Sequence, residues 1–234
     1  MDGCADPRPY TLLSCCMSLD GYLAGPTRRR LLLSNDADFD RVDEVRAGCD
    51  AILVGAATGR KDDPRLLVRT PERRAARVAR GQPPSPTKVT VTGGADLDPG
   101  ARFFTDGDGQ RLVYCASSAV DVARDRLGEL ATVVDGGEPV DVAWMVRDLY
   151  GRGIRRLMVE GGGTVHTQFL TGDLADELTL AVAPFFVGDH RARRFVDDGR
   201  FPFHPERRAR LVQVRQLGDV VVVRYALSAR FGTW

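Results

Sequence analysis

The chain has 234 residues, of which 43% are hydrophobic and 28% are charged, and its formal net charge is +1. This balance is typical of a globular protein, and the near-neutral charge gives no general attraction to nucleic acid or to an anionic membrane. No apolar run approaches the ~18 residues of a membrane span, and the first residues lack an apolar signal segment, so we expect a cytoplasmic location.

The first two thirds of the chain alternate between strand and helix patterns. Residues 9–17 predict a buried strand, and the Asp20-Gly21 pair after it favours a turn. Residues 51–55 are a short apolar run, typical of a strand covered on both faces. The other expected elements are helices over 36–48, 71–81, 118–130, 139–153 and 163–173, strands over 87–92, 111–116, 132–135 and 154–160, and a polar loop over 56–69.

The C-terminal third changes to strands alone. Residues 176–186 alternate and then become apolar, and residues 210–227 predict a hairpin that turns at Gly218-Asp219. Strands that alternate with helices predict a mainly parallel sheet with helices on both faces, and the hairpin should add antiparallel edge strands. No long linker and no repeat divides the chain, so we expect residues 1–234 to form a single domain.

The segment MVEGGG, residues 158–163, places a carboxylate and three glycines at the end of a predicted strand. Ligands of parallel sheets bind beyond the carboxyl ends of the strands, and glycine lets the backbone approach them closely. The helix that follows offers free N–H groups, which favour phosphate. The sequence is not a standard dinucleotide fingerprint, so two interpretations stay open: a phosphate or dinucleotide site with Glu160 facing a ligand, or a glycine-rich turn with a structural carboxylate.

The segment GAATGRKDDPRLLVR, residues 55–69, follows another strand end and should face the same crevice. Thr58, Asp62 and Asp63 offer hydrogen-bonding groups, and Arg69, with Arg46 on the preceding helix, could clamp a phosphate. The alternative is a solvated loop with a turn at Asp63-Pro64.

The helix over 71–81 places Arg73, Arg77 and Arg80 on one stripe, which is either a solvated face or a contact for the 2′-phosphate of a cofactor. Five cysteines are irregularly spaced without C-x-x-C, which disfavours a disulfide framework. Three histidines lie far apart without ligand spacing, so we expect no metal site.

Three segments in this order resemble the riboflavin-pathway pyrimidine reductases: SCCMSLDGYLAG, then VRAGCDAILVGAATGRKDDPRLLVR, then MVEGGGTVHTQFL with LADELTLAVAPFFVG. That family is the C-terminal reductase domain of the bifunctional deaminase–reductase, with stand-alone relatives. The resemblance runs over a core of about residues 9–227. It implies a dihydrofolate-reductase-like α/β fold, with three α/β/α layers, a mainly parallel central sheet and antiparallel C-terminal edge strands.

The resemblance also implies an activity. Family members use NADPH to reduce the ribosyl group of a 5-amino-6-(5-phosphoribosylamino)pyrimidine to a ribitylamino group, through an opened sugar that receives hydride at C1′. The partner is then a small phosphorylated pyrimidine. By motif, the positions on the substrate side are Ser14, Asp20, Arg46, Leu66, Arg69 and Glu160, with Glu160 also catalytic. The positions on the cofactor side are Thr58, Asp62, Gly161, Gly162, Gly163, Thr164 and Val165.

The chain departs from the family pattern in several places. The zinc signature of the deaminase half, H-x-E with P-C-x-x-C, is missing, so we expect reduction without deamination. Ser14 stands where the bifunctional branch often has lysine. The serine and tryptophan often found before the first helix of that branch align near Arg30 and Leu32, and the family's cofactor-contacting serine aligns near Gly93, so this chain lacks them.

These departures leave three functional interpretations open. The first is the riboflavin-type reductase. The second is a paralogue that reduces a pterin or the heterocycle of a specialised metabolite. The third is a dinucleotide-binding relic without turnover. Family members are commonly dimers, and the apolar C-terminal strands would suit a homodimer interface.

Overall fold

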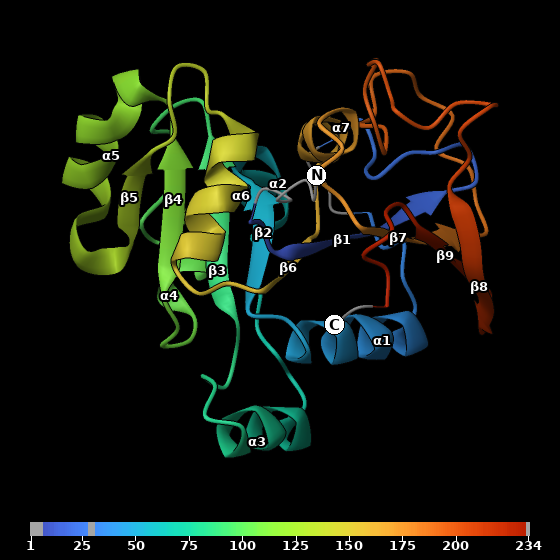
Figure 1. The fold of residues 1–234 in the computed structure, drawn as a ribbon, viewed down its shortest axis with the longest axis horizontal. Coiled ribbons are helices and arrows are strands. Elements are labelled where there is room, and N and C mark those ends of the chain that lie inside the picture. Colours follow the sequence, from blue (N-terminus) through green and yellow to red (C-terminus); the bar gives the residue numbers. More distant parts are fainter. Residues whose placement is uncertain (1–6, 28–30, 233–234) are drawn as a thin grey trace, which may run out of the picture.

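The computed structural model describes residues 7–27 and 31–232, which form one nine-stranded sheet with helices on both faces (Figure 1). The strands are β1 (Tyr10–Ser18), β2 (Ala51–Gly55), β3 (Thr87–Thr92), β4 (Arg111–Cys115), β5 (Thr132–Asp135), β6 (Arg156–Val159), β7 (Glu177–Ala183), β8 (Arg210–Leu217) and β9 (Val220–Ala226). The helices are α1 (Asp36–Ala47), α2 (Ala56–Asp62), α3 (Pro71–Ala79), α4 (Arg102–Thr105), α5 (Val120–Leu127), α6 (Val142–Gly151) and α7 (Gly163–Thr171). Two short 3₁₀ turns, Ser117–Ala119 and Gly128–Leu130, flank α5.

The strand order is β5-β4-β3-β2-β6-β1-β7-β9-β8. All neighbours from β5 to β7 are parallel, and β9 and β8 join as an antiparallel hairpin. The hairpin turns at Gly218, whose φ of 62° suits glycine, so the predicted turn is confirmed. The expected α/β class, with its mainly parallel sheet and antiparallel C-terminal strands, is also confirmed.

Two apolar layers fill the space between the sheet and its helices. Alternation along β2 sends Leu53 to the face covered by α6 and α7, and Ile52 and Val54 to the face covered by α1, α4 and α5. All three side chains are buried, as expected for a parallel strand covered on both faces. The same alternation along β6 places Met158 on the α1 face, so Glu160, two residues later, leaves the strand toward α1.

The polar loop expected over 56–69 is wrong in its first half, because α2 begins directly after β2. Gly55 ends the strand in extended backbone, and Asp63 ends the helix in the left-handed region with a φ of 40°. Two alanines at the start of the segment favour helix, while Gly59 and the polar residues conceal the pattern. The second half, 64–70, has no regular structure.

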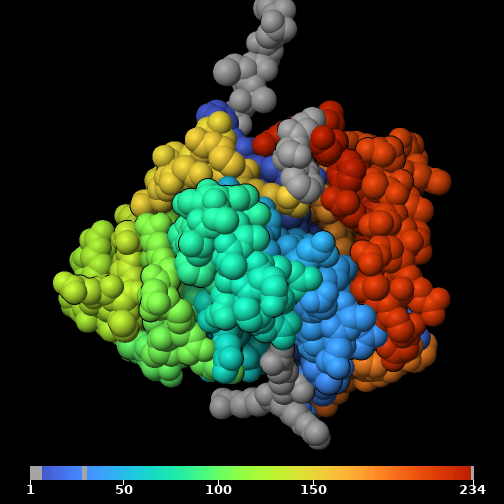
Figure 2. Space-filling view, turned by 90° about the horizontal axis from the view of Figure 1, so that it is seen from below, coloured from blue at the N-terminus to red at the C-terminus, as the bar shows by residue number. Residues whose placement is uncertain are grey.

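The arginine stripe of α3 is not a solvated face throughout, because Arg77 is buried and Arg73 is half-buried, while Arg80 is exposed. Helices α1 and α3 lie side by side (Figure 2), and the stripe turns toward α1. Arg77 is buried and donates to the carbonyl oxygens of Ala47 and Cys49 at 3.0 and 2.7 Å. Arg73 donates to Asp40 at 2.6 Å, so the stripe holds α3 against the rest of the domain.

Candidate functional site

A main cavity of about 870 Å³ lies where the carboxyl ends of β1, β2 and β6 meet helices α1, α2 and α7. This is the position that parallel sheets use for ligands. Ten of the site residues predicted from sequence line it: Ser14, Arg46, Thr58, Asp62, Arg69, Glu160, Gly162, Gly163, Thr164 and Val165. The sheet therefore brings together segments that lie far apart in the sequence.

Glu160 and Arg46 form a two-pronged ion pair inside the cavity. Arg46 Nε and Nη2 each donate to one carboxylate oxygen of Glu160, both at 2.7 Å, and Arg46 Nη1 donates to the carbonyl of Leu67 at 3.2 Å. The two side chains are only 14% and 15% exposed. Burial alone would lower the pKa of Arg46, but the charge and hydrogen bonds of Glu160 outweigh it and raise that pKa above its ordinary value.

This geometry gives Arg46 a role that differs from the phosphate clamp predicted from the sequence. Its planar fork matches the carboxylate of Glu160, so the two-pronged face that would clamp a phosphate is occupied by protein. Its place in the last turn of α1 also suits a cation, because the C-terminal end of a helix carries a partial negative charge. Arg46 therefore fixes where the carboxylate of Glu160 lies in the cavity.

The glycines after Glu160 form a turn that passes close to other backbone and side-chain atoms. Gly161 has a φ of 117°, and the peptide bond to Gly162 is cis. A Cβ at Gly162 would lie 2.8 Å from Thr58 Oγ1, and a Cβ at Gly163 would overlap the carbonyl oxygen of Arg194. Glycine is therefore required for space at Gly163, where the close atom is backbone, whereas a Cβ at Gly162 would displace the hydroxyl of Thr58.

The turn leads into the nine-residue helix α7. Gly162 precedes the helix and has no side chain that could cap its first N–H groups. These N–H groups and the positive end of the helix dipole are suited to a phosphate. The turn is also fastened to the end of β2, since Gly55 N–H donates to the carbonyl of Gly161 at 2.8 Å.

The other residues predicted on the cofactor side differ in orientation. Thr58, from α2, lies directly against Gly162, and both line the cavity. Thr164 Oγ1 donates to Asp197 at 3.0 Å, at the rim of the cavity. Val165 packs toward Gly55 and is buried, so only its backbone is available to a ligand. Asp62 lines the cavity at the end of α2.

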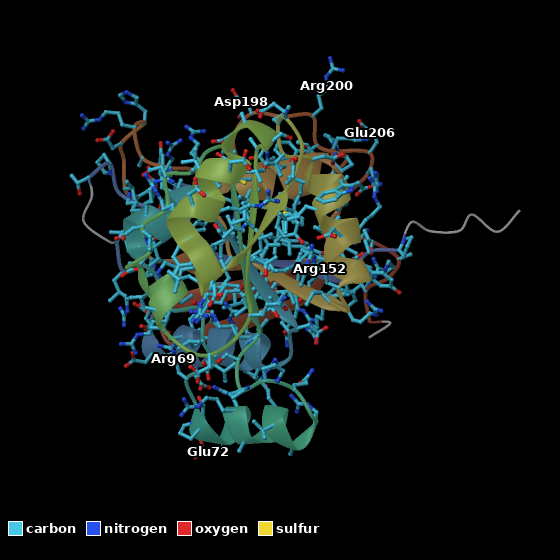
Figure 3. All side chains as sticks on the ribbon, turned by 90° about the vertical axis from the view of Figure 1, so that its left-hand side faces the viewer. Arg69, Glu72, Arg152, Asp198, Arg200 and Glu206 are labelled. Carbon is cyan, nitrogen blue, oxygen red and sulfur yellow. The ribbon has the colours of Figure 1, made fainter. Side chains whose placement is uncertain are left out.

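Arg69 lies at the mouth of the cavity, beside α1 and α3 and at the far end of the molecule from Asp198 and Arg200 (Figure 3). Its side chain is 53% exposed, and Nη2 donates to the carbonyl of Phe39 at 3.0 Å. The neighbouring backbone is held by Asp43, which accepts from Arg69 N–H at 2.6 Å. A half-exposed guanidinium at this place can meet an anionic group that enters the cavity.

Three residues predicted for the site lie outside the main cavity. Leu66 is fully buried in the apolar layer under α1, with a φ of 51°. Gly161 makes the turn itself. Asp20 accepts hydrogen bonds from Ser18 Oγ at 2.5 Å and from the N–H groups of Val187 and Gly188 at 3.0 and 2.7 Å, and so joins two loops.

These bonds also set the protonation of Asp20. Burial raises its pKa, but the hydroxyl of Ser18 and the backbone N–H donors outweigh that effect and lower the pKa to about 2. The role of Asp20 that follows from the geometry is to hold the loop after β1 against the loop after β7. Of the departures from the family pattern, Arg30 lies outside the described residues, Leu32 is exposed and Gly93 faces open space.

Sequence reasoning missed two charged residues of the cavity, Asp38 and Arg41. Both are buried in α1, line the cavity near Ser14, and form an ion pair in which Arg41 Nε donates to Asp38 Oδ1 at 2.8 Å. The sequence feature that could have indicated a cavity position for Asp38 is its spacing from Val42 and Arg46. Residues at i, i+4 and i+8 lie on one face of a helix, so Asp38 shares the face of Arg46. This feature was concealed because α1 carries other aspartates at similar positions.

His166 was also missed. It is fully buried in α7, and a Cβ on Gly161 would lie 3.3 Å from its ring. Burial lowers the pKa of His166 to about 4, which keeps the ring neutral near pH 7. It therefore supports the glycine turn by packing and not by charge.

Comparison with known sequences identifies relatives of nearly the same length. The family described as RibD C-terminal domain matches residues 9–223. A protein of Methanothermobacter thermautotrophicus is 36% identical over 226 residues, which cover 94% of this chain and 99% of the relative. One of Archaeoglobus fulgidus is 32% identical over 225 residues, 96% of this chain and 99% of the relative. Both are named 2,5-diamino-6-ribosylamino-4(3H)-pyrimidinone 5′-phosphate reductase.

Solved structures share the fold. Acinetobacter baumannii RibD superposes with a TM-score of 0.76 at 23% identity, over 94% of this chain and 58% of that chain. The riboflavin biosynthesis reductase Rib7 of Saccharomyces cerevisia superposes with a TM-score of 0.70 at 19% identity, over 94% and 90%. The sequence match over most of the chain, together with this fold, shows that the protein belongs to the family of the RibD C-terminal domain, a family of pyrimidine reductases in riboflavin biosynthesis.

Proposed function

We propose that this chain reduces the ribosylamino group of 2,5-diamino-6-ribosylamino-4(3H)-pyrimidinone 5′-phosphate to a ribitylamino group, with NADPH as the reductant. The observation that carries the proposal is the end of β6. There a carboxylate, Glu160, faces one part of the cavity, and the glycine turn directly after it opens to another part. One strand end can thus serve two ligands that have to meet. The names of the two full-length relatives supply the substrate.

The residues present fit a dinucleotide. The glycine turn has no room for a Cβ at Gly163, and the uncapped start of α7 offers N–H groups for a pyrophosphate. Thr58, Asp62 and Thr164 would hold the nicotinamide half by hydrogen bonds. When bound, the nicotinamide would supply a hydride to the substrate carbon.

The choice of NADPH over NADH is part of the proposal. A second cavity of about 880 Å³ shares Ala57, Lys61 and Asp63 with the main cavity. Its wall includes the cations Arg60 and Lys61 of α2, which suit the extra phosphate of NADPH. A preference for NADPH in the ratio of kcat/KM values supports this assignment, and equal use of NADH counts against it.

On the substrate side, Arg69 is suited to hold the 5′-phosphate at the cavity mouth, because its guanidinium is half exposed and only partly engaged. The Glu160 carboxylate, fixed by Arg46, would face the opened sugar. There it would accept hydrogen bonds from the sugar and stabilise the positive charge that develops at C1′ before hydride arrives. Catalysis would then consist mainly of positioning two bound molecules.

The test follows loss of the nicotinamide absorbance with three compounds in parallel: the 2,5-diamino substrate, its deaminated counterpart and dihydrofolate. Turnover of the 2,5-diamino substrate supports the proposal. Turnover of dihydrofolate alone would assign the chain to a pterin reductase, and NADPH binding without any turnover would indicate a relic.

A homodimer is proposed on a separate observation. Strand β8 forms one edge of the sheet, and Leu211 and Val214 on it are 52% and 59% exposed, as is the nearby Val221 at 42%. An exposed edge with apolar side chains favours pairing with a second copy. Light scattering should give twice the mass of the chain, and replacement of Leu211 and Val214 by lysine should give the monomer mass.

Within the described part of the chain, no helix is long and apolar enough to cross a membrane.

A further inference from the structure

One part of the main cavity, against α1, ends in an ion pair whose hydrogen-bonding capacity is not used up. Arg41 Nε donates to Asp38 Oδ1 at 2.8 Å, and both side chains are buried. Asp38 Oδ2 and Arg41 Nη1 are buried too, yet neither has a hydrogen-bond partner within residues 7–27 and 31–232. Such atoms are rare in folded proteins because burying a polar group without a partner is unfavourable, so these two atoms are suited to hydrogen-bond a ligand that enters the cavity.

Other carboxylates of the cavity are already engaged. Both oxygens of Glu160 accept from Arg46 at 2.7 Å, and Asp197 accepts from Thr164 at 3.0 Å. The carboxylate of Asp38 is different because its second oxygen, Oδ2, is buried and has no hydrogen-bond partner among the described residues. Asp38 and Arg41 together therefore leave one acceptor and one donor without a protein partner, and the pair carries no net charge.

The surroundings indicate which part of the substrate would meet this pair. The walls nearby are small or apolar and include Ser14, Cys16 and Val42. A carboxylate repels the 5′-phosphate, which has Arg69 at the mouth. The sugar has to meet the hydride near Glu160. The heterocycle is the remaining part, and it is flat, uncharged and edged with N–H groups.

Asp38 and Glu160 also lie at different depths along the cavity. Arg46, which holds Glu160, is eight residues after Asp38 on the same face of α1, which corresponds to ~12 Å along the helix axis. A ligand that reaches both carboxylates must therefore be extended. A pyrimidine joined to an opened sugar phosphate has that shape.

We propose that Asp38, together with Arg41, binds the edge of the pyrimidine that carries position 2 and makes the enzyme selective for a 2-amino over a 2-oxo ring. The proposal rests on the function proposed above. Asp38 Oδ2 accepts from the 2-amino group, and Arg41 Nη1 donates to the carbonyl at C4. A 2-oxo ring places an oxygen against the carboxylate and leaves one acceptor without a donor. Sites of this kind discriminate by ~10²–10⁴-fold.

The first test measures binding without turnover. The probes are 2,5,6-triamino-4-pyrimidinone and 5,6-diaminouracil, which differ only at position 2, and calorimetry measures their affinities in the presence of NADPH. We expect the wild-type protein to bind the triamino ring at least ~100-fold more tightly. Equal affinities, or no binding of either ring, would overturn the proposal without the need for any variant.

The variant is Asp38→Asn, which keeps the size of the side chain and replaces the open acceptor with an amide that can also donate. Its matched control is Asp40→Asn, the same change on the same helix at a side chain that is 66% exposed and outside the cavity wall. The preference for the 2-amino ring should fall to ~3-fold or less in Asp38→Asn and stay unchanged in Asp40→Asn. An unchanged preference in Asp38→Asn contradicts the assignment.

Steady-state kinetics with the 2,5-diamino substrate and its deaminated counterpart separates the two proposals. If the wild-type protein turns over these substrates and Asp38→Asn leaves the ratio of kcat/KM values unchanged, the reaction stands and the role of Asp38 falls. If the protein turns over neither substrate, but binding shows a preference at position 2 that Asp38→Asn removes, the role of Asp38 stands and the reaction falls.

Discussion

The ion pair between Arg46 and Glu160 makes a prediction about stability that is independent of any assay of the reaction. Glu160→Gln keeps one oxygen that can accept from Arg46 and replaces the other with an amide that cannot. It removes one charge-assisted hydrogen bond of 2.7 Å and leaves a guanidinium that is 14% exposed without its counter-charge. Loss of a partner from a fully buried pair costs ~3–5 kcal/mol, so with this slight exposure we expect a loss of about 2–3 kcal/mol.

Urea denaturation of the wild-type protein and Glu160→Gln measures this difference, provided that the two denaturant slopes agree. In a chain of this size the loss corresponds to a decrease in Tm of roughly 5–10 °C. The double variant Arg46→Met with Glu160→Gln removes the unpaired cation, and we expect it to be more stable than the sum of the single changes predicts. In the reaction, kcat should fall by ~10²-fold while the Kd for NADPH changes little.

Two results would refute this reasoning. If Glu160→Gln unfolds within about 0.5 kcal/mol of the wild-type protein, the pair does not stabilise the fold in the way its geometry indicates. If turnover and NADPH affinity fall by the same factor, Glu160 does not act on the substrate side.

Gly163→Ala would force a Cβ onto the carbonyl of Arg194, so NADPH affinity should fall by ~10-fold or more, while Gly151→Ala, which meets open space away from the cavity, should leave it unchanged in the same titration. Arg69→Ala should raise KM by ~10–100-fold with kcat nearly unchanged, and the effect should vanish with a substrate that lacks the phosphate. The pKa of Asp20 is about 2 in the folded protein, below its ordinary value of 3.8, so its contribution to stability is present above pH 3.8 and is lost as the pH falls toward 2. The Tm of Asp20→Asn should therefore depend less on pH over this range than the Tm of the wild-type protein. The same pH dependence of Tm in both proteins would exclude the effect.

The sequence predicted the elements that carry their own pattern. The strand over 51–55 and the turn at Gly218 are determined by residues that are close together in the sequence. Their structure can therefore be predicted from the sequence alone. The predicted strand before the glycines also follows from a local apolar run, and β6 ends at Val159, directly before Glu160. The cavity lies at this strand end.

Long-range contacts could not be predicted in this way. Asp20 looks like part of a ligand segment, but its partners Val187 and Gly188 come from the loop after β7. Arg46 looks like a phosphate ligand until the sheet places Glu160 beside it. Asp38 cannot be told apart from Asp36 or Asp40 until the fold shows which of them faces the cavity. In each case the role depends on a segment that only the tertiary structure brings near.

The position of β1 has a consequence for how the chain acquires its structure. β1 is synthesised before the other strands of this sheet, yet within the sheet it pairs only with β6 and β7, and the partner of Tyr10 is Arg156, about two thirds of the way along the given sequence. The strand must remain unpaired while the intervening helices and strands are synthesised, and non-local parallel pairing is slow. Its apolar side chains are then exposed for most of synthesis, so chaperones should bind nascent chains that stop before β6 and release those that extend past β7.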